Sequence, residues 1–360
     1  MTRPVVFWQP ILSIHQTPLL EEFGRIYPGP VYLVVDKLIP ETRADAGWNV
    51  RPPSSVQLIS PDEDVAGVPS RAMHVVSGYV GPRRWVQERK RVLSDDQADV
   101  IVMVEGFSRL GGPLKRAARF VKQWRGRMHL RHHLRGVLAI GQRARRQAKR
   151  MGMPVERIYP MLYATALPRT KQQQQIPQGA AVFVGRRSER KNTAELIRAT
   201  AGLCPLVLIG PKEKGYDDGA DTREHVHVLG PIANESLADF LREAAVLVLP
   251  SWYDGWGAVV NEALACGTPV VCSRYAGAAD LITSFGPFRG VVVDRPDEEQ
   301  LREAIAQVLH AKQERAVIRA WAEQSISPAA VAPYLQECLL AAAGNHAARP
   351  TAPWHAGVVR

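Results

Sequence analysis

Short apolar runs alternate with longer amphipathic stretches along the whole chain. The runs in the first half predict strands at residues 5–8, 31–35, 56–59, 100–104 and 137–140. Those in the second half predict strands at residues 181–184, 206–209, 225–229, 246–249, 269–272 and 291–293. Helical patterns lie at residues 113–124, 142–151, 193–201, 235–243, 258–266 and 298–310. This alternation is typical of parallel sheets with helices on both faces, so the predicted fold class is α/β.

A polar segment separates two series of such elements. Residues 171–179 read Lys-Gln-Gln-Gln-Gln-Ile-Pro-Gln-Gly, which is typical of an interdomain linker. A length of 360 residues also suits two domains. We therefore expect one Rossmann-like domain over residues 1–170, a second over 180–342 and an irregular tail over 343–360. Ligands bind at the carboxyl ends of parallel strands, so the site is expected where the two domains face each other.

The composition is that of a globular protein, with 46% hydrophobic and 22% charged residues. No apolar run approaches the ~20 residues that a membrane span needs. The apolar patch at residues 5–8 ends at Gln9 and Pro10, so it suits a strand better than a signal peptide, and a cytoplasmic protein is expected. The four cysteines lack the spacing of a metal site, and no disulfide framework is expected.

The positive charge belongs to the first half of the chain. Residues 1–175 hold 28 Lys or Arg and 14 Asp or Glu, whereas residues 176–360 hold 18 and 21. The stretch 106–155 contains 14 Lys or Arg and no acidic residue. Such a field attracts phosphate groups, an anionic lipid surface or nucleic acid, and the alternative is a charged solvent face. No recognition motif accompanies the charge, so no nucleic-acid partner is expected.

The strongest chemical signal is a strand, loop and helix at residues 249–270. Gly255 and Gly257 allow a ligand to approach the loop backbone, and the helix start offers free N–H groups. Asp254 lies on the loop, and Glu262 lies about 8 Å along the helix from Gly257. Two acids so spaced suit an elongated polar ligand, with a sugar at one end and a ribose at the other. The alternative is an ordinary strand–loop–helix unit with two acids by chance.

A second segment strengthens the first. Residues 184–192 read Val-Gly-Arg-Arg-Ser-Glu-Arg-Lys-Asn after the first strand of the second domain. Its arginines and Lys191 place fixed cations just after that strand.

Together these segments resemble the retaining glycosyltransferases of family four. The resemblance rests on three segments: the acid-Gly-aromatic-Gly run at 254–257, the Glu-Ala-Leu-Ala-Cys-Gly-Thr-Pro-Val run at 262–270, and the Gly-Arg-x-x-x-x-Lys element at 185–191. The resemblance is specific over about residues 180–340 and diffuse before them. It implies the GT-B fold, in which two Rossmann-like domains with parallel sheets face each other across a cleft. It also implies that the final helix, near residues 328–342, packs back toward the first domain.

The resemblance assigns roles to matching positions. It implies that Glu262 holds the ribose hydroxyls and that Asp254, a glutamate in the family, faces the transferred sugar. It implies that Arg186 and Lys191 grip the diphosphate. The other implied donor-binding residues are Gly185, Gly230, Trp256, Gly257 and Ala258.

The expected function is transfer of a sugar from a nucleotide-diphosphate donor to a glycan or lipid-linked acceptor in cell-surface polysaccharide synthesis. The resemblance implies a retaining, metal-independent enzyme with no cofactor beyond its donor. Asp217 and Asp218 look incidental, so they are not a metal motif. We expect a place on the inner membrane face, because the first domain is basic. The alternatives are a sugar-nucleotide epimerase of similar architecture and a non-catalytic sugar-nucleotide-binding subunit.

The acceptor side is less defined. Glu105 ends a predicted strand and is a candidate to orient or deprotonate the acceptor hydroxyl, although a helix-capping or surface acid is the alternative. His15 follows the first strand, and either a catalytic residue or a polar loop histidine fits its place. Trp256 suits either stacking on a sugar or base or packing beside a core strand.

Overall fold

The computed structural model describes residues 2–40, 50–108, 110–166, 176–283, 286–312, 314–344 and 348–356. They form two compact units. The first contains the described residues up to Ala164 together with Pro328–Pro353, and the second contains those of Thr165–Ser327 and those after Pro353. Residues 171–175 of the predicted linker lie outside the described residues.

The first unit is built on a sheet of seven parallel strands in the order β3-β2-β1-β4-β5-β6-β7. Their bounds are β1 Val5–Gln9, β2 Val31–Val35, β3 Gln57–Ile59, β4 Met73–Ser77, β5 Asp99–Glu105, β6 Leu134–Ile140 and β7 Ile158–Met161. The central strands are buried on both faces, as expected of near-continuous apolar runs. Strand order reverses between β1 and β4.

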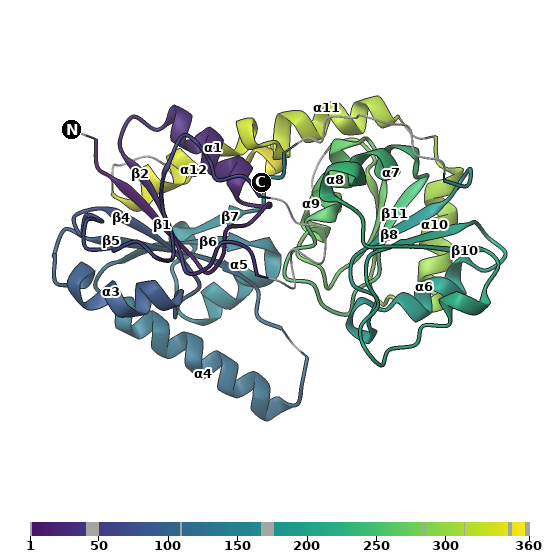
Figure 1. Cartoon of the computed structure of the whole chain (residues 1–360), viewed down its shortest axis with the longest axis horizontal. Helices are drawn as coiled ribbons and strands as arrows, with labels where there is room; N and C mark the ends of the chain where they lie inside the picture. Colours follow the sequence, from purple (N-terminus) through teal and green to yellow (C-terminus); the bar gives the residue numbers. More distant parts are fainter. Residues whose placement is uncertain are drawn as a thin grey trace. The chain divides into compact units, whose positions relative to one another are not determined.

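Five helices of the described chain cover this sheet: α1 Thr17–Ile26, α3 Arg83–Leu93, α4 Pro113–Leu130, α5 Gly141–Arg150 and α12 Pro328–Ala342. Figure 1 shows α1 and α12 on one face of the sheet and α3 and α4 on the other. The Tyr334 hydroxyl of α12 donates to the Pro160 carbonyl of β7 at 2.8 Å. The expectation that the final helix returns to the first half of the chain is therefore confirmed.

The second unit is built on six parallel strands in the order β10-β9-β8-β11-β12-β13. Their bounds are β8 Ala181–Val184, β9 Leu206–Ile209, β10 Val226–Gly230, β11 Val246–Leu249, β12 Val270–Ser273 and β13 Gly290–Val293. The predicted α/β class with two parallel sheets is therefore correct. Strand order reverses between β8 and β11, which fixes where a ligand is expected.

The helices of the second unit lie on both faces of its sheet. They are α6 Thr193–Thr200, α7 Leu237–Glu243, α8 Val259–Ala265, α9 Ala279–Thr283, α10 Glu298–His310 and α11 Arg315–Ile326. Helices α6 and α10 contact each other on one face, and α8 contacts α7 and α11 on the other. Within the described residues of both units, no helix is long and apolar enough to span a membrane.

Candidate functional site

Two loops of the second unit meet at the point where its strand order reverses. One follows β8 and the other follows β11, and these two strands are neighbours in the sheet. Loops at such a point lie outside the carboxyl ends of the strands, where open α/β sheets bind their ligands. Both sequence motifs fall on these loops, so the topology brings together segments about 60 residues apart in the chain.

An ion pair joins the two loops. Lys191 Nζ donates to Asp254 Oδ2 at 2.5 Å, and the two side chains are 13% and 16% exposed. The loop backbones are also tied, because Trp252 N donates to Arg190 O at 3.0 Å and Arg190 Nη1 donates to Tyr253 O at 2.7 Å. Two predicted donor-site residues are thus held side by side, and both remain reachable from solvent.

Glycines give this site a bare backbone surface. Gly185 has a φ of 142°, and a Cβ added to it would lie 3.7 Å from Lys191 Nζ. Gly257 has a φ of 93°, and a Cβ there would come within 2.5 Å of Leu249 Cδ2. Gly230 ends the edge strand β10 and accepts a hydrogen bond from Gly210 N at 2.7 Å. Side chains are excluded at Gly185 and Gly257, so a ligand can approach their peptide groups closely.

Glu262 lies on α8 and is buried. The structure gives its carboxyl no side-chain hydrogen bond to the residues it describes, and burial raises its pKa to about 7. A buried carboxyl group without partners costs folding free energy.

Replacing Glu262 with glutamine should remove a pH-dependent loss of stability. In the native state the carboxyl pKa is raised from 4.5 to about 7, so the folded chain keeps a proton that the unfolded chain has lost between these pH values. The wild-type free energy of unfolding should therefore fall as pH rises through this window, by on the order of 3 kcal/mol from this group. Urea unfolding at pH 5 and pH 8 measures this difference in the free energy of unfolding. Glu262→Gln should lack this component, the exposed control Glu243→Gln should retain it, and equal pH dependence in all three proteins would contradict it.

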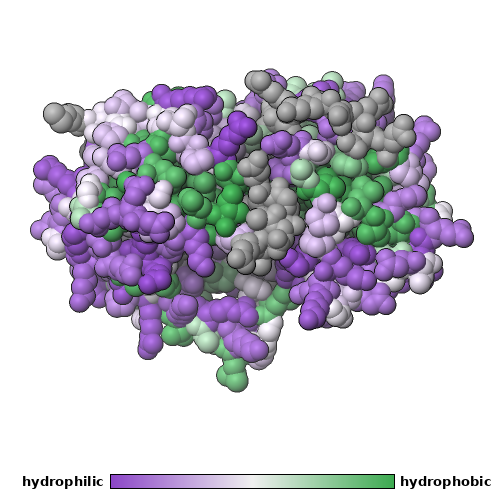
Figure 2. All heavy atoms as spheres, in the orientation of Figure 1, coloured by the Kyte–Doolittle hydropathy of each residue, from purple (hydrophilic) through white to green (hydrophobic). Residues whose placement is uncertain are grey.

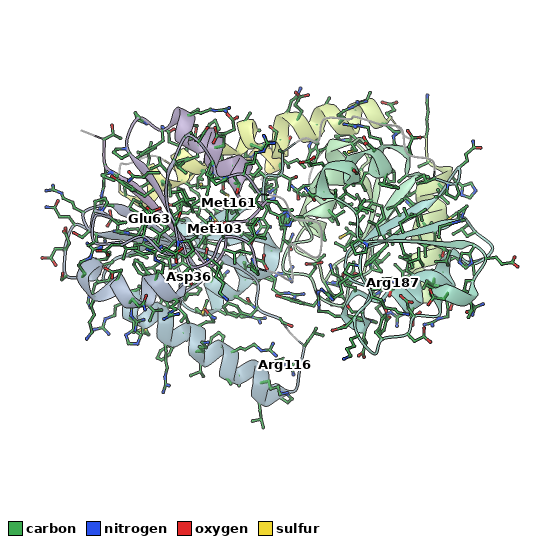
Figure 3. All side chains as sticks on the ribbon, viewed as in Figure 1. Asp36, Glu63, Met103, Arg116, Met161 and Arg187 are labelled. Carbon is green, nitrogen blue, oxygen red and sulfur yellow. The ribbon has the colours of Figure 1, made fainter. Side chains whose placement is uncertain are left out.

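The two arginines of the first loop have different environments. Arg186 is exposed, and among the described residues its side chain has no ion pair. Arg187, which is labelled in Figure 3, is buried. Its Nη1 lies 3.1 Å from Asp218 Oδ1. Thr193 Oγ1 donates to Asp218 Oδ2 at 2.9 Å. In the sequence Asp218 looks incidental. The structure shows instead that it anchors the loop that carries Lys191.

Trp256 packs in the interior. Its side chain is 2% exposed, and Nε1 donates to Asn261 Oδ1 at 2.7 Å. Its ring therefore has the packing role, and stacking on a sugar or base was the wrong alternative. Any ligand contact at Trp256, Gly257 and Ala258 is left to the backbone, and α8 begins at Val259, later than predicted.

The candidate acceptor-side residues meet in the first unit. The Tyr163 hydroxyl donates to Glu105 Oε1 at 2.6 Å, and its ring stacks on the His15 ring with centroids 6.3 Å apart. All three residues are half-buried. His15 follows β1, Glu105 ends β5 and Tyr163 follows β7, so each lies at the carboxyl edge of the sheet. Tyr163 was not predicted, because the strand that precedes it, β7 Ile158–Met161, was not predicted either.

No group of three or more His, Cys, Asp or Glu side chains that could hold a metal ion is found in the part of the chain that the structure describes.

The unit that carries the ion pair matches a known family model. Residues 168–325 match the model of the glycosyl transferases group 1 family. This part of the chain is therefore similar to the glycosyltransferase group 1 domains. The match covers the loops after β8 and β11 together with α8, and thus every predicted donor-binding residue.

Curated relatives are similar to this chain over about two fifths of its length. The O-antigen chain mannosyltransferase B of Escherichia coli is 31% identical over 161 residues, which are 41% of each chain. The putative teichuronic acid biosynthesis glycosyltransferase TuaC of Bacillus subtilis is 32% identical over 38% of this chain and 34% of its own. The D-inositol 3-phosphate glycosyltransferase of Mycolicibacterium smegmatis is 31% identical over 41% of this chain and 36% of its own. The matched part thus spans less than half of these relatives.

Solved structures share the fold of both units. Anabaena HepE in complex with UDP has a TM-score of 0.68 at 14% identity, over 94% of this chain and 100% of that chain. A putative UDP-N-acetylglucosamine 2-epimerase from Listeria monocytogenes has a TM-score of 0.60 at 12% identity, over 98% and 99%. The predicted GT-B fold is confirmed, and the fold alone does not separate a transferase from an epimerase.

Proposed function

We propose that this chain transfers a sugar from a nucleotide-diphosphate donor to a glycan or lipid-linked acceptor, with retention of anomeric configuration and without a metal or other cofactor. The observation that carries the proposal is the Lys191–Asp254 pair at the strand-order reversal of a unit similar to the glycosyltransferase group 1 domains. Cell-surface polysaccharide synthesis on the inner face of the plasma membrane is the proposed setting. The O-antigen and teichuronic acid relatives support it by their names.

The donor site assigns one role to each part of the ligand. Lys191 and Arg186 neutralise the diphosphate, whose charge grows as the bond to the sugar breaks. Asp254 faces the transferred sugar, and Glu262 accepts hydrogen bonds from the ribose hydroxyls. Gly185, Gly230, Gly257 and Ala258 supply backbone contacts. UDP bound to HepE, a protein of the same fold, supports a nucleotide ligand.

The reaction needs no protein nucleophile. The acceptor oxygen bonds to the anomeric carbon, the bond between that carbon and the β-phosphate oxygen breaks, and the diphosphate receives the acceptor proton. Lys191 stabilises the developing negative charge in this step. Because Lys191 pairs with Asp254, a diphosphate competes with this carboxylate for the ammonium group.

On the acceptor side, Glu105 orients the hydroxyl that attacks. Its hydrogen bond from Tyr163 fixes the carboxylate, and the stacked rings of Tyr163 and His15 offer an aromatic surface for a sugar. His15 remains the second candidate for proton transfer there.

A sugar-nucleotide epimerase is the second candidate, favoured by the similarity to the Listeria epimerase fold. It would convert the donor without an acceptor. A non-catalytic subunit would bind the donor without any turnover.

A screen of UDP-, GDP- and ADP-sugars for thermal stabilisation and slow hydrolysis tests the proposal. One donor class should raise the melting temperature by mass action, and Lys191→Ala and Glu262→Ala should lose that response. With an acceptor present, Glu105→Gln should reduce transfer but leave hydrolysis unchanged. Epimerised donor in the absence of acceptor, or stabilisation that persists in both donor-site variants, would reject the proposal.

A further inference from the structure

Helix α4 packs on the first unit through its polar side. Gly126 and Leu130 are buried, and a Cβ added to Gly126 would lie 2.7 Å from Tyr79 O. On the same side, Arg119 donates to Ser108 O and Leu110 O, both at 2.6 Å. This contact face therefore includes a glycine, an arginine whose guanidinium donates to backbone carbonyls, and a single buried leucine near the end of the helix.

The opposite side of α4 is apolar and faces solvent. Leu114 is 86% exposed, Val121 46% and Trp124 44%. Together with Ala117 they recur at intervals of three and four residues, which places them in one stripe along the helix. A surface helix normally turns such a stripe toward the core, so α4 is inverted. Figure 2 shows apolar atoms among hydrophilic ones along the lower edge of the view, where Figure 1 places α4.

Cations flank this apolar stripe, which comprises Leu114, Ala117, Val121 and Trp124. Lys115, Arg116, Lys122 and Arg125 are exposed on α4 (Arg116 is labelled in Figure 3). No acidic residue occurs in the stretch 106–155 to pair with them. A second copy of the chain docked through this face would oppose cations with cations, which disfavours self-association. Nucleic acid would satisfy the cations but would leave the apolar stripe in water.

We propose that α4 docks the first unit onto an anionic lipid bilayer, lying in its plane with the apolar stripe inserted among the lipids. An anionic bilayer meets both requirements, because headgroups pair with the lysines and arginines while the acyl boundary takes Leu114, Val121 and Trp124. The 18-residue helix carries charged side chains along its whole length and is not apolar enough to cross a membrane, so it lies on the surface. This inference deepens the proposed function by naming the surface, and it rests on that function only for the lipid-linked acceptor.

Sedimentation with vesicles tests the insertion. The wild-type chain should bind vesicles of phosphatidylglycerol and phosphatidylcholine and not vesicles of phosphatidylcholine alone. Leu114→Ser with Val121→Ser should weaken binding at least about tenfold, because two apolar side chains no longer leave water. Both side chains are exposed, so folding should survive. Val317→Ser on α11, 42% exposed in the wild type, is the matched control and should bind normally.

Charge variants and donor binding complete the test. Lys115→Glu with Lys122→Glu should also weaken binding and lower its sensitivity to salt. Vesicle binding as strong as that of the wild type in either double variant, or equal binding of the wild-type chain to both vesicle types, would overturn the proposal. So would self-association or duplex DNA binding that Leu114→Ser with Val121→Ser abolishes without any effect on vesicles. Thermal stabilisation by the nucleotide-sugar should persist in all these variants, so a failure of the donor site and a failure of docking are told apart.

Discussion

Replacing Lys191 with methionine should lower kcat/KM for sugar transfer by about 10²–10³-fold, the effect of removing one preorganised group that stabilises transition-state charge. The loss should fall mainly on kcat, because charge on the diphosphate grows as the glycosidic bond breaks. Methionine keeps much of the side-chain length, and the loops remain tied through Trp252 and Arg190. Steady-state kinetics with the donor selected by the screen measures the effect.

The matched control is Lys214→Met, at an exposed position on the loop after β9. It should change kcat/KM less than about twofold, because an exposed charge away from the site contributes little. A loss in the Lys191 variant no larger than in this control would show that Lys191 does not contact the leaving group.

Replacing Asp218 with alanine should destabilise the chain by about 3–5 kcal/mol, because it leaves the Arg187 guanidinium buried without its carboxylate. The hydrogen bond from Thr193 is lost with it. Urea unfolding monitored by circular dichroism measures the change.

A double variant separates the ion pair from simple packing. Arg187→Leu combined with Asp218→Ala removes both charges and should recover most of the stability that Asp218→Ala alone loses. Additive losses in the double variant, or a loss below about 1 kcal/mol in Asp218→Ala, would contradict this account of the loop anchor.

The apolar pattern predicted most of the two sheets but missed two strands. The prediction of residues 31–35 agrees with β2, whereas β4 escaped because His74 interrupts its apolar run. The buried His74 ring accepts a hydrogen bond at Nδ1 from Trp8 Nε1 at 3.1 Å. Burial lowers the pKa of His74 to about 4, which keeps the ring neutral. Strand β7 escaped because it contains Pro160, a residue that sheets accept at an edge such as this one.

The sequence identified the donor loops because their spacing is local. Lys191 and Asp254 were each recognised within a short motif, and the parallel topology then explains their contact. The role of Asp218 escaped because a loop acid gives no sign of burial until the fold pairs it with Arg187. Tyr163 escaped for the same reason, since only the sheet brings it to Glu105, 58 residues away.

The central claim is that Lys191 and Glu262 bind one nucleotide, and calorimetric titration tests it most directly. UDP, GDP and ADP would each be titrated in EDTA into the wild-type chain, Lys191→Met and Glu262→Ala. The account predicts that one nucleotide binds the wild-type chain at one site without metal, and that each variant weakens binding about 10–100-fold through loss of a charged contact. Binding of no nucleotide, or equal affinity in all three proteins, would contradict it.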